Sequence, residues 1–264
     1  MTCSIQAIDL HSHLNHGVPG DKKTSPIYRA DADFLRQMYR STNIVCGAFS
    51  TFASVLSHQG LTEENAFMGE FAQQNDWCFF WAVADPRQPE TLLQAEALLD
   101  HPKCLGIKLH PSYHGYSLPE YADHLFGLAN ERRAVVLTHP TPEEEFDAVV
   151  SCVNRHPDMK LIIAHLGSLA HIRAIRQAEY QNIYTDTSGQ AMKFNYILEY
   201  AVEQVGSQHI FFGTDTFSCA FQRGRVEYAM IRPEDKENIL RNNALRVFEK
   251  LRLFDAAELG GEGS

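Results

Sequence analysis

The stretch AVVLTHP at residues 134–140, followed by a helical segment and then KLIIAHLG at residues 160–167, decides the fold of this chain. Each of the two stretches begins with a short apolar run rich in Val, Leu or Ile, which suits a strand that is buried on both faces. Residues 143–153 lie between them and repeat apolar side chains at offsets of three and four, as an amphipathic helix does. This order predicts two parallel strands joined by a helix, each ending in a histidine.

The same unit recurs along the chain of 264 residues. Apolar runs predict eight strands, at residues 5–10, 43–49, 77–84, 104–109, 134–138, 160–164, 182–186 and 209–213. Helical spacing follows at residues 62–74, 90–99, 143–153, 169–178, 194–205 and 233–251. Eight strand–helix units in about 250 residues match the size of an α/β fold of the (β/α)8 (TIM) barrel type. A doubly wound open sheet is the structural alternative, and it fits the number of units less well.

We therefore expect one domain, residues 1–250, and a partly disordered C-terminal tail, residues 251–264. The net charge of −10 argues against nucleic acid as a partner, because such a surface repels phosphates. No run approaches the roughly 20 apolar residues of a membrane span, and the first residues do not show the pattern of a signal peptide. The six cysteines are scattered without a Cys-x-x-Cys pair, which indicates reduced thiols in a cytoplasmic protein.

Polar residues gather where five of the predicted strands end. In a TIM barrel these C-terminal ends build the active site. His11 and His13 are two residues apart on an extended segment, so both imidazoles can face the same side. Imidazole suits Zn, Fe, Ni and similar ions, and a carboxylate completes a mixed site. With His139, His165 and Asp215 at the ends of other strands, the pattern predicts a metal site at the rim.

Lys108 and His110 end the fourth strand and share one face of it. A lysine inside a barrel needs a partner or a modification. We expect Lys108 to be held by an ion pair or hydrogen bond beside a single metal ion, with Asp9, which has the inward parity of His11, as a candidate partner; the alternative is a carboxylated lysine that bridges two metal ions. Lys108 is also a candidate contact for the substrate. For His110, a contact with substrate and a buried hydrogen-bonded role are both open.

Further residues in the rim loops are candidates for recognising a substrate carboxylate. Arg87 follows the third strand, and Tyr113 and His114 follow the fourth. A helix cap or a surface ion pair is the alternative for Arg87. For His114 a structural role is equally open.

Six motifs and their order resemble a known family. They are DLHSH (9–13), GIKLHP (106–111), THP (138–140), IAHLG (163–167), YTDTSG (184–189) and FGTD (212–215). The last predicted helix contains DKENIL at residues 235–240. Together they closely resemble the amidohydrolase-related group of metal-dependent hydrolases with a TIM-barrel fold, in the amidohydrolase superfamily. The resemblance covers residues 5 to about 250.

The resemblance implies one divalent metal ion per chain, with zinc expected before manganese, held by His11, His13, His139 and Asp215. It implies that Asp215 also accepts the proton of the attacking water, and that His165 orients water or substrate. Lys108 and His110 match a motif of the group whose role is less fixed.

The implied activity is hydrolysis of a small carboxylic ester, lactone or amide. The group also contains non-oxidative decarboxylases, so decarboxylation of a small unsaturated or aromatic acid is the alternative. The compact chain favours the hydrolase. A barrel that has lost catalysis and serves as a binding protein is the third interpretation. We expect a small-molecule substrate and no membrane partner, and a homo-oligomer is compatible with the sequence.

Overall fold

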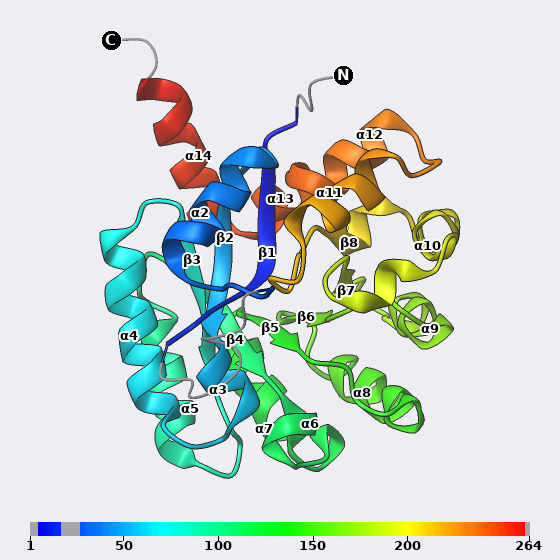
Figure 1. The fold of residues 1–264 in the computed structure, drawn as a ribbon. Coiled ribbons are helices and arrows are strands. Elements are labelled where there is room, and N and C mark those ends of the chain that lie inside the picture. The colour runs from blue at the N-terminus through cyan, green and yellow to red at the C-terminus, as the bar shows by residue number, and fades with distance from the viewer. Residues whose placement is uncertain (1–4, 17–26, 262–264) are drawn as a thin grey trace.

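The eight strands form one parallel barrel. The computed structural model describes residues 5–16 and 27–261, in which strands and helices alternate around a common axis (Figure 1). The strands are β1 (Ala7–Leu14), β2 (Ile44–Thr51), β3 (Cys78–Val83), β4 (Cys104–Leu109), β5 (Val135–Thr138), β6 (Lys160–Ile163), β7 (Ile183–Asp186) and β8 (Ile210–Phe211). They pair in parallel and in chain order. The Leu10 N–H donates to the carbonyl of Phe212 over 2.9 Å and joins the first strand to the last. The expected (β/α)8 barrel is confirmed, and the open doubly wound sheet is not formed.

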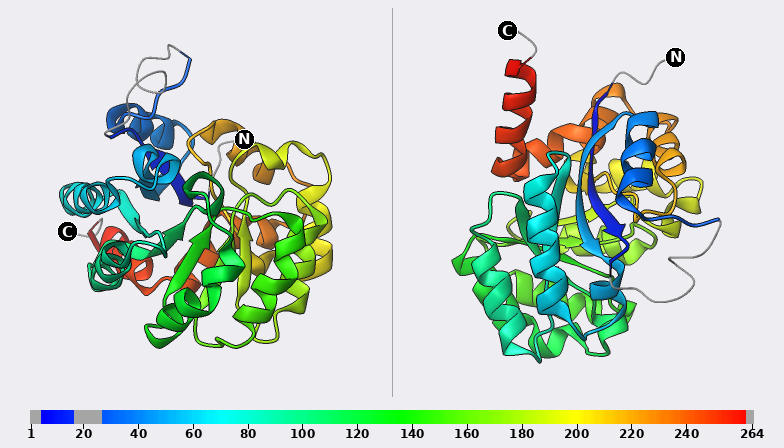
Figure 2. Two further views of the ribbon diagram at one scale, coloured as in Figure 1. Left: turned by 90° about the horizontal axis from the view of Figure 1, so that it is seen from below. Right: turned by 60° about the vertical axis from the view of Figure 1, so that its left-hand side comes forward.

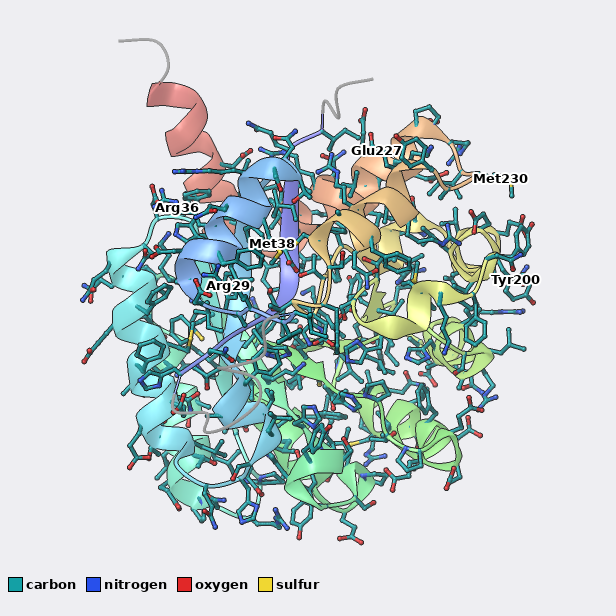
Figure 3. The ribbon with its side chains drawn as sticks, viewed as in Figure 1. Arg29, Arg36, Met38, Tyr200, Glu227 and Met230 are labelled. Atoms are coloured by element: carbon teal, nitrogen blue, oxygen red, sulfur yellow. The ribbon has the colours of Figure 1, made fainter. Side chains whose placement is uncertain are left out.

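The helices form the outer layer around the strands (Figure 2). They are α2 (Ala32–Ser41), α3 (Phe52–Leu56), α4 (Leu61–Gln74), α5 (Pro89–Leu98), α6 (Pro111–His114), α7 (Leu118–Glu131), α8 (Phe146–Val153), α9 (Leu169–Gln177), α10 (Ile197–Val205), α11 (Cys219–Glu227), α12 (Pro233–Glu237), α13 (Asn243–Val247) and α14 (Glu249–Gly261). Side-chain caps start several of them, as when Asp31 accepts from the N–H of Phe34 and Ser168 accepts from the N–H of Ala170. Arg36 on α2 and Met230 after α11 lie on the outside of this layer (Figure 3).

Two apolar clusters hold the barrel together. The larger one packs the outer faces of the strands against the helices. The smaller one fills the barrel interior with side chains such as Trp81 and Phe211. Phe248 and Leu251 close the interior at the end of the barrel where α14 begins. There the Phe248 ring lies edge-on to Trp81, with the ring centroids 5.9 Å apart. The interior is therefore a packed plug, and the opposite rim is the end where a TIM barrel builds its active site.

Three elements differ from the expected boundaries. Strand β1 continues to Leu14, so the His-x-His motif lies inside the strand. The segment expected as one helix at residues 233–251 is divided into α12, a π turn at Asn238–Asn242, α13 and the start of α14. Helix α14 crosses residue 250, and its buried Leu251 belongs to the barrel interior. Residues 262–264 of the expected tail lie outside the described residues. The partial disorder of the C-terminal tail stays a prediction.

The two ends of the barrel have different roles. Helices α3 and α6, which directly follow β2 and β4, lie at one end, and α14 lies at the other (Figure 1). The functional residues expected from the sequence belong to the α3 and α6 end. Within residues 5–16 and 27–261, no helix is both long enough and apolar enough to cross a membrane.

Candidate active site

His11, His13 and Asp215 come together at the rim. The Nε2 atom of His13 lies 3.0 Å from Asp215 Oδ1, and that of His11 lies 3.7 Å from the same oxygen. One donor atom from each residue lies within 4.8 Å of the other two. A tetrahedral ion with ligands at 2.0–2.2 Å separates its ligand atoms by about 3.3–3.6 Å. The three donors therefore fit a divalent cation, and their N and O chemistry suits zinc, manganese or iron.

Hydrogen bonds from neighbouring side chains orient the imidazoles of His11 and His13 for binding a cation. His11 Nδ1 lies 2.9 Å from Asp186 Oδ2, and His13 Nδ1 lies 3.0 Å from Ser50 Oγ. A carboxylate only accepts, so His11 carries its proton on Nδ1 and keeps the lone pair of Nε2 for the site. Burial alone would raise the pKa of Asp215, but its hydrogen bond to His13 and the charges of the nearby histidines hold that pKa below its ordinary value.

An irregularity in β1 explains why Asp9 does not face the site. The register with β2 shifts between Asp9 and Ser12, so the alternation of faces breaks there. Asp9 accepts from the Tyr39 hydroxyl at 2.7 Å and from the Thr214 hydroxyl at 2.6 Å, away from the group formed by His11, His13 and Asp215. The expected pair between Asp9 and Lys108 is wrong, because the parity argument assumed a regular strand.

Lys108 instead contacts a candidate metal ligand. It is fully buried, and its Nζ lies 2.7 Å from His11 Nε2. Burial lowers the pKa of Lys108 to about 8, opposed by the carboxylates of Asp215 and Asp186. The ammonium thus uses the same lone pair of His11 that a metal ion would need. The sequence-based expectation that Lys108 points into the barrel is confirmed, and its partner is His11.

Three further histidines line the other side of the site. The His139 ring stacks on His110 with centroids 4.2 Å apart and lies edge-on to His165 at 5.1 Å. His139 Nδ1 donates to its neighbouring carbonyl, Pro140 O, over 3.2 Å, which leaves Nε2 as the acceptor. Burial and the neighbouring His165 lower the pKa of His139 to about 3. Among the described donor atoms, His139 is not in the close set formed by His11, His13 and Asp215.

These residues surround one cavity of about 310 Å³. Its lining combines imidazoles and Asp215 with the apolar side chains of Phe52, Val55, Leu56 and Phe217. The Phe52 ring packs against His13 with the centroids 4.9 Å apart, and Phe217 is 44% exposed. Tyr113 also lines the cavity, as its place after β4 predicts.

Arg87 and His114 have supporting positions instead. The Arg87 guanidinium donates to both oxygens of Asp85, at 2.9 and 2.6 Å, and to the carbonyls of His114 and Gly115. His114 Nε2 lies 2.9 Å from the carbonyl of Ser54. Among the described residues around the cavity, neither is part of the lining. The structure therefore places them as supports of α6, and Arg87 has the ion-pair role that was its alternative.

Two functional neighbours escaped the sequence analysis, Asp186 and Ser188. Both are buried at the end of β7, and both contact His11 Nδ1. Their signal was the YTDTSG motif, which places a carboxylate at the C-terminal end of a strand. Nothing in the local sequence indicated that this carboxylate would meet a histidine 175 residues away.

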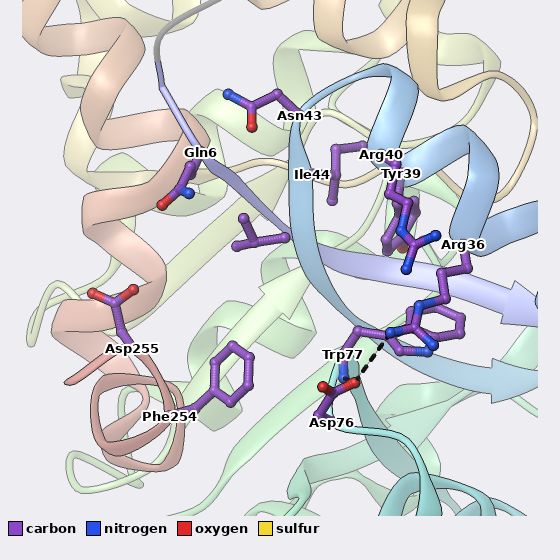
Figure 4. A pocket seen from close by; sticks show the side chains of 11 residues that line it. Gln6, Arg36, Tyr39, Arg40, Asn43, Ile44, Asp76, Trp77, Phe254 and Asp255 are labelled. Carbon is purple, nitrogen blue, oxygen red and sulfur yellow. Dashed lines mark hydrogen bonds and ion pairs between the residues drawn. The ribbon is translucent and has the colours of Figure 1, made fainter. Parts of the chain in front are cut away.

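Two other places among the described residues have some features of a site. A cavity of about 390 Å³ lies at the opposite end, between α2 and α14, next to Arg36, Trp77 and Phe254 (Figure 4). Its described lining residues include no histidine. On the surface, donor atoms of Asp123, Cys152 and His156 also lie close enough together to hold a cation. However, Arg155 donates over 2.8 Å to Asp123 Oδ1, the same oxygen that lies next to His156. The chemistry therefore belongs to the rim.

Comparison with known proteins agrees with this geometry. Residues 8–250 match the Amidohydrolase family. The chain belongs to this family. No curated protein matches the chain by sequence. The amidohydrolase match includes every metal-ligand candidate, from His11 to Asp215.

Solved structures share the amidohydrolase barrel at low identity. A 2,6-dihydroxybenzoate decarboxylase from Rhizobium superposes with a TM-score of 0.74 at 15% identity, covering 93% of this chain and 99% of that one. A dihydroxybenzoic acid decarboxylase from Polaromonas, with bound manganese and 2-nitroresorcinol, gives 0.71 at 15% identity, covering 93% and 97%. An amidohydrolase from Burkholderia multivorans with bound zinc gives 0.71 at 15% identity, covering 92% and 99%.

Proposed function

We propose that this amidohydrolase-family protein is a metal-dependent, non-oxidative decarboxylase of a small aromatic or unsaturated carboxylic acid. The observation that supports it is the cavity of about 310 Å³, whose lining combines histidines and Asp215 with the apolar side chains of Phe52, Val55, Leu56 and Phe217. A single ring can pack on Phe52 and Phe217 while its polar substituents face the imidazoles and Asp215. The decarboxylase neighbours that act on or bind dihydroxybenzoates support the same substrate class.

The chain's own residues have distinct tasks in this reaction. His11, His13 and Asp215, together with His139, would hold the cation. A divalent cation bound there would draw in the oxygens of the substrate and stabilise their negative charge. Lys108 adds a buried positive charge beside them.

The proton needed by the reaction has a donor within the cavity wall. As the bond to the carboxylate breaks, its electron pair stays on the substrate carbon and takes up a proton from Nε2 of His165, which carries a proton on both ring nitrogens for this step, and CO2 leaves. The neutral imidazole then regains its Nε2 proton from water. The position of His165 supports this role, because it lines the cavity and its ring stacks against His11 with the centroids 4.9 Å apart.

Hydrolysis of an ester, lactone or amide was the first expectation from the sequence, and chain length was its support. That argument loses its force because the decarboxylase structures superpose over 97–99% of their own length. Hydrolysis would use the same residues, with Asp215 accepting the proton of water. The two reactions are separated by their products.

A substrate panel tests the proposal. Protein loaded with manganese or zinc is offered hydroxylated benzoates and unsaturated acids, and separately lactones, esters and amides, with CO2 release and acid release measured independently. We expect metal-dependent CO2 release from aromatic acids, abolished in His11→Ala. Acid release from lactones without CO2 would identify a hydrolase, and a metal-loaded protein without turnover on either set would identify a binding protein.

The proposal includes both zinc and manganese as the bound ion, since one neighbouring structure holds manganese and another holds zinc. We also propose a cytoplasmic small-molecule enzyme, supported by the five described cysteines, which are all free and buried. A homo-oligomer remains a prediction.

A further inference from the structure

Ser188 lies at the meeting point of three groups of the site. Its Oγ is 2.9 Å from His11 Nδ1 and 2.8 Å from His165 Nδ1. It also makes a very short hydrogen bond with Asp186 Oδ1. One hydroxyl thus connects a candidate metal ligand, the candidate proton donor and a buried carboxylate.

The carboxylate of Asp186 acts as an acceptor only. Its Oδ1 accepts from the backbone N–H of Ser188 at 2.9 Å and from that of His165 at 3.1 Å. Its Oδ2 accepts from His11 Nδ1 at 2.9 Å. Because a carboxylate that is surrounded by donors has no proton to give, the single hydroxyl proton of Ser188 must point toward Asp186.

The proton count then fixes the tautomer of His165. With its only proton on Asp186, Ser188 Oγ can only accept from His165 Nδ1. His165 therefore carries a proton on Nδ1, and its Nε2 is left for the cavity. His11 has the same tautomer, because its Nδ1 donates to Asp186.

We propose that Asp186 and Ser188 are a positioning pair that fixes the Nδ1–H tautomer of both His11 and His165, so that Nε2 is the working nitrogen of each. For His11 this nitrogen is the metal ligand. For His165 it is the atom that exchanges a proton with the substrate, a role that rests on the proposed function. The tautomer assignment itself does not depend on which reaction is catalysed.

The glycines around the pair keep it compact. A Cβ added at Gly189 would lie 2.7 Å from His165 Nδ1, and one added at Gly213 would lie 3.0 Å from the Cβ atoms of His11 and Ser188. Side chains at these positions would separate the hydroxyl from the imidazoles. Asp186 also holds the backbone of His165, whose φ is 64°, in its left-handed conformation.

Nitrogen-15 NMR of histidine-labelled protein, free of metal and substrate, tests this directly, because the ring nitrogens report which of them is protonated. The chain contains its own references. His209 Nδ1 donates to the carbonyl of Ile183 over 3.0 Å, and His171 Nε2 donates to that of Ala164 over 3.0 Å. The His165 signal, identified by its loss in His165→Gln, should match the His209 pattern. A His171-like pattern in the unmutated protein would overturn the proposal.

The variant Ser188→Ala removes the acceptor that holds the His165 proton. We expect the His165 signal to move toward the Nε2–H pattern, while His11 keeps Nδ1–H through Asp186. The matched control is Ser168→Ala, which removes a serine hydroxyl 3.3 Å from His171 Nδ1 and should leave the His165 pattern unchanged. An unchanged His165 pattern in folded Ser188→Ala would show that Ser188 does not set the tautomer.

Kinetics give a second readout. Loss of such a supporting contact typically costs about 10–100-fold in activity. In Ser188→Ala we expect this loss in kcat with little change in KM and with metal content retained, since His11 keeps its partner. Ser188→Thr, which keeps the hydroxyl, should restore the His165 signal. If the panel finds hydrolysis instead of decarboxylation, the proposed function fails while the NMR result stands, so the two failures are distinguishable.

Discussion

Lys108 and a divalent cation compete for the same nitrogen of His11, and this competition is open to measurement. At an effective dielectric constant of about 20, two unit charges 4 Å apart repel by about 4 kcal/mol. Replacing Lys108 by the uncharged Met should therefore tighten metal binding at least about tenfold, at an unchanged one ion per chain. Metal content and competition with a chelator give both quantities. The control is Lys103→Met, whose Nζ bonds the carbonyl of Asp76; its metal affinity should stay as in the wild type.

The opposite result for Lys108 would be equally informative. If the wild type binds two ions and Lys108→Met binds one, the lysine is a carboxylated bridge and the single-metal interpretation is wrong.

Asp215 is the one carboxylate among the described residues that line the cavity. Asp215→Asn keeps the size of the side chain and a weakly coordinating oxygen but cannot exchange a proton. We expect most of the metal to be retained at saturating ion in either reaction. If the reaction is hydrolysis, with Asp215 as the base, kcat should fall about 10²–10⁴-fold at a similar KM. In the proposed decarboxylation the proton comes from His165, so kcat should stay much closer to that of the wild type. Metal analysis and steady-state kinetics on the same sample check this, and a large loss of kcat with metal bound would contradict the assignment of proton transfer to His165.

Strand β4 shows how a single glycine positions the side chains of Lys108 and His110. A Cβ at Gly106 would lie 2.1 Å from the carbonyl oxygen of Val135 and 2.9 Å from the Trp81 ring. Gly106→Ala should therefore cost about 1–3 kcal/mol of unfolding free energy by overpacking, and should displace Lys108 and His110 on the same strand. Urea unfolding measures the loss.

Gly224 on α11 is the matched control, because a Cβ there meets nothing within 4 Å. Gly224→Ala should stabilise the protein by about 0.5–1 kcal/mol through helix propensity. Equal effects of the two substitutions would contradict the packing argument.

The elements also show what the sequence can and cannot predict. Strands buried on both faces are recognisable as apolar runs, so the barrel and the rim positions of His139, His165 and Asp215 were predictable. The irregularity in β1 was not, because it depends on pairing with β2; it reversed the expected direction of Asp9. Likewise Asp186 meets His11 only through closure of the barrel, and local sequence contains no signal for that contact.

For the whole molecule, the buried histidines predict sensitivity to acid. Burial lowers the pKa of His11 and of His139 to about 3, and it also lowers the pKa of His13 and His110. In the unfolded chain these groups titrate near pH 6.5. Below that pH the unfolded state binds protons that the native state does not, so this stability is complete above pH 6.5 and is lost as pH falls toward 3.

We expect the metal-free protein to lose up to about 2 kcal/mol of unfolding free energy per buried histidine between pH 7 and pH 5. Urea unfolding at the two pH values measures the total. In His110→Gln the difference between the two pH values should shrink by about that amount. A difference that is the same in wild type and variant would contradict the assignment of His110 as a buried neutral group.

The barrel closes between β1, one of its two longest strands, and β8, its shortest. β8 comprises only Ile210–Phe211, and beyond it the backbone contacts to β1 are those of Leu10 with Phe212 and of His11 with Thr214 and Asp215. His11 and His13 lie on one side of this junction and Asp215 on the other. A cation held by them would be a cross-link between the two ends of the chain. If the cation kept its ligands in the unfolded chain, it would close a loop of about 200 residues there. It would then lower the conformational entropy of the unfolded chain, as a disulfide does. The ion that binds the substrate oxygens would then also stabilise the fold.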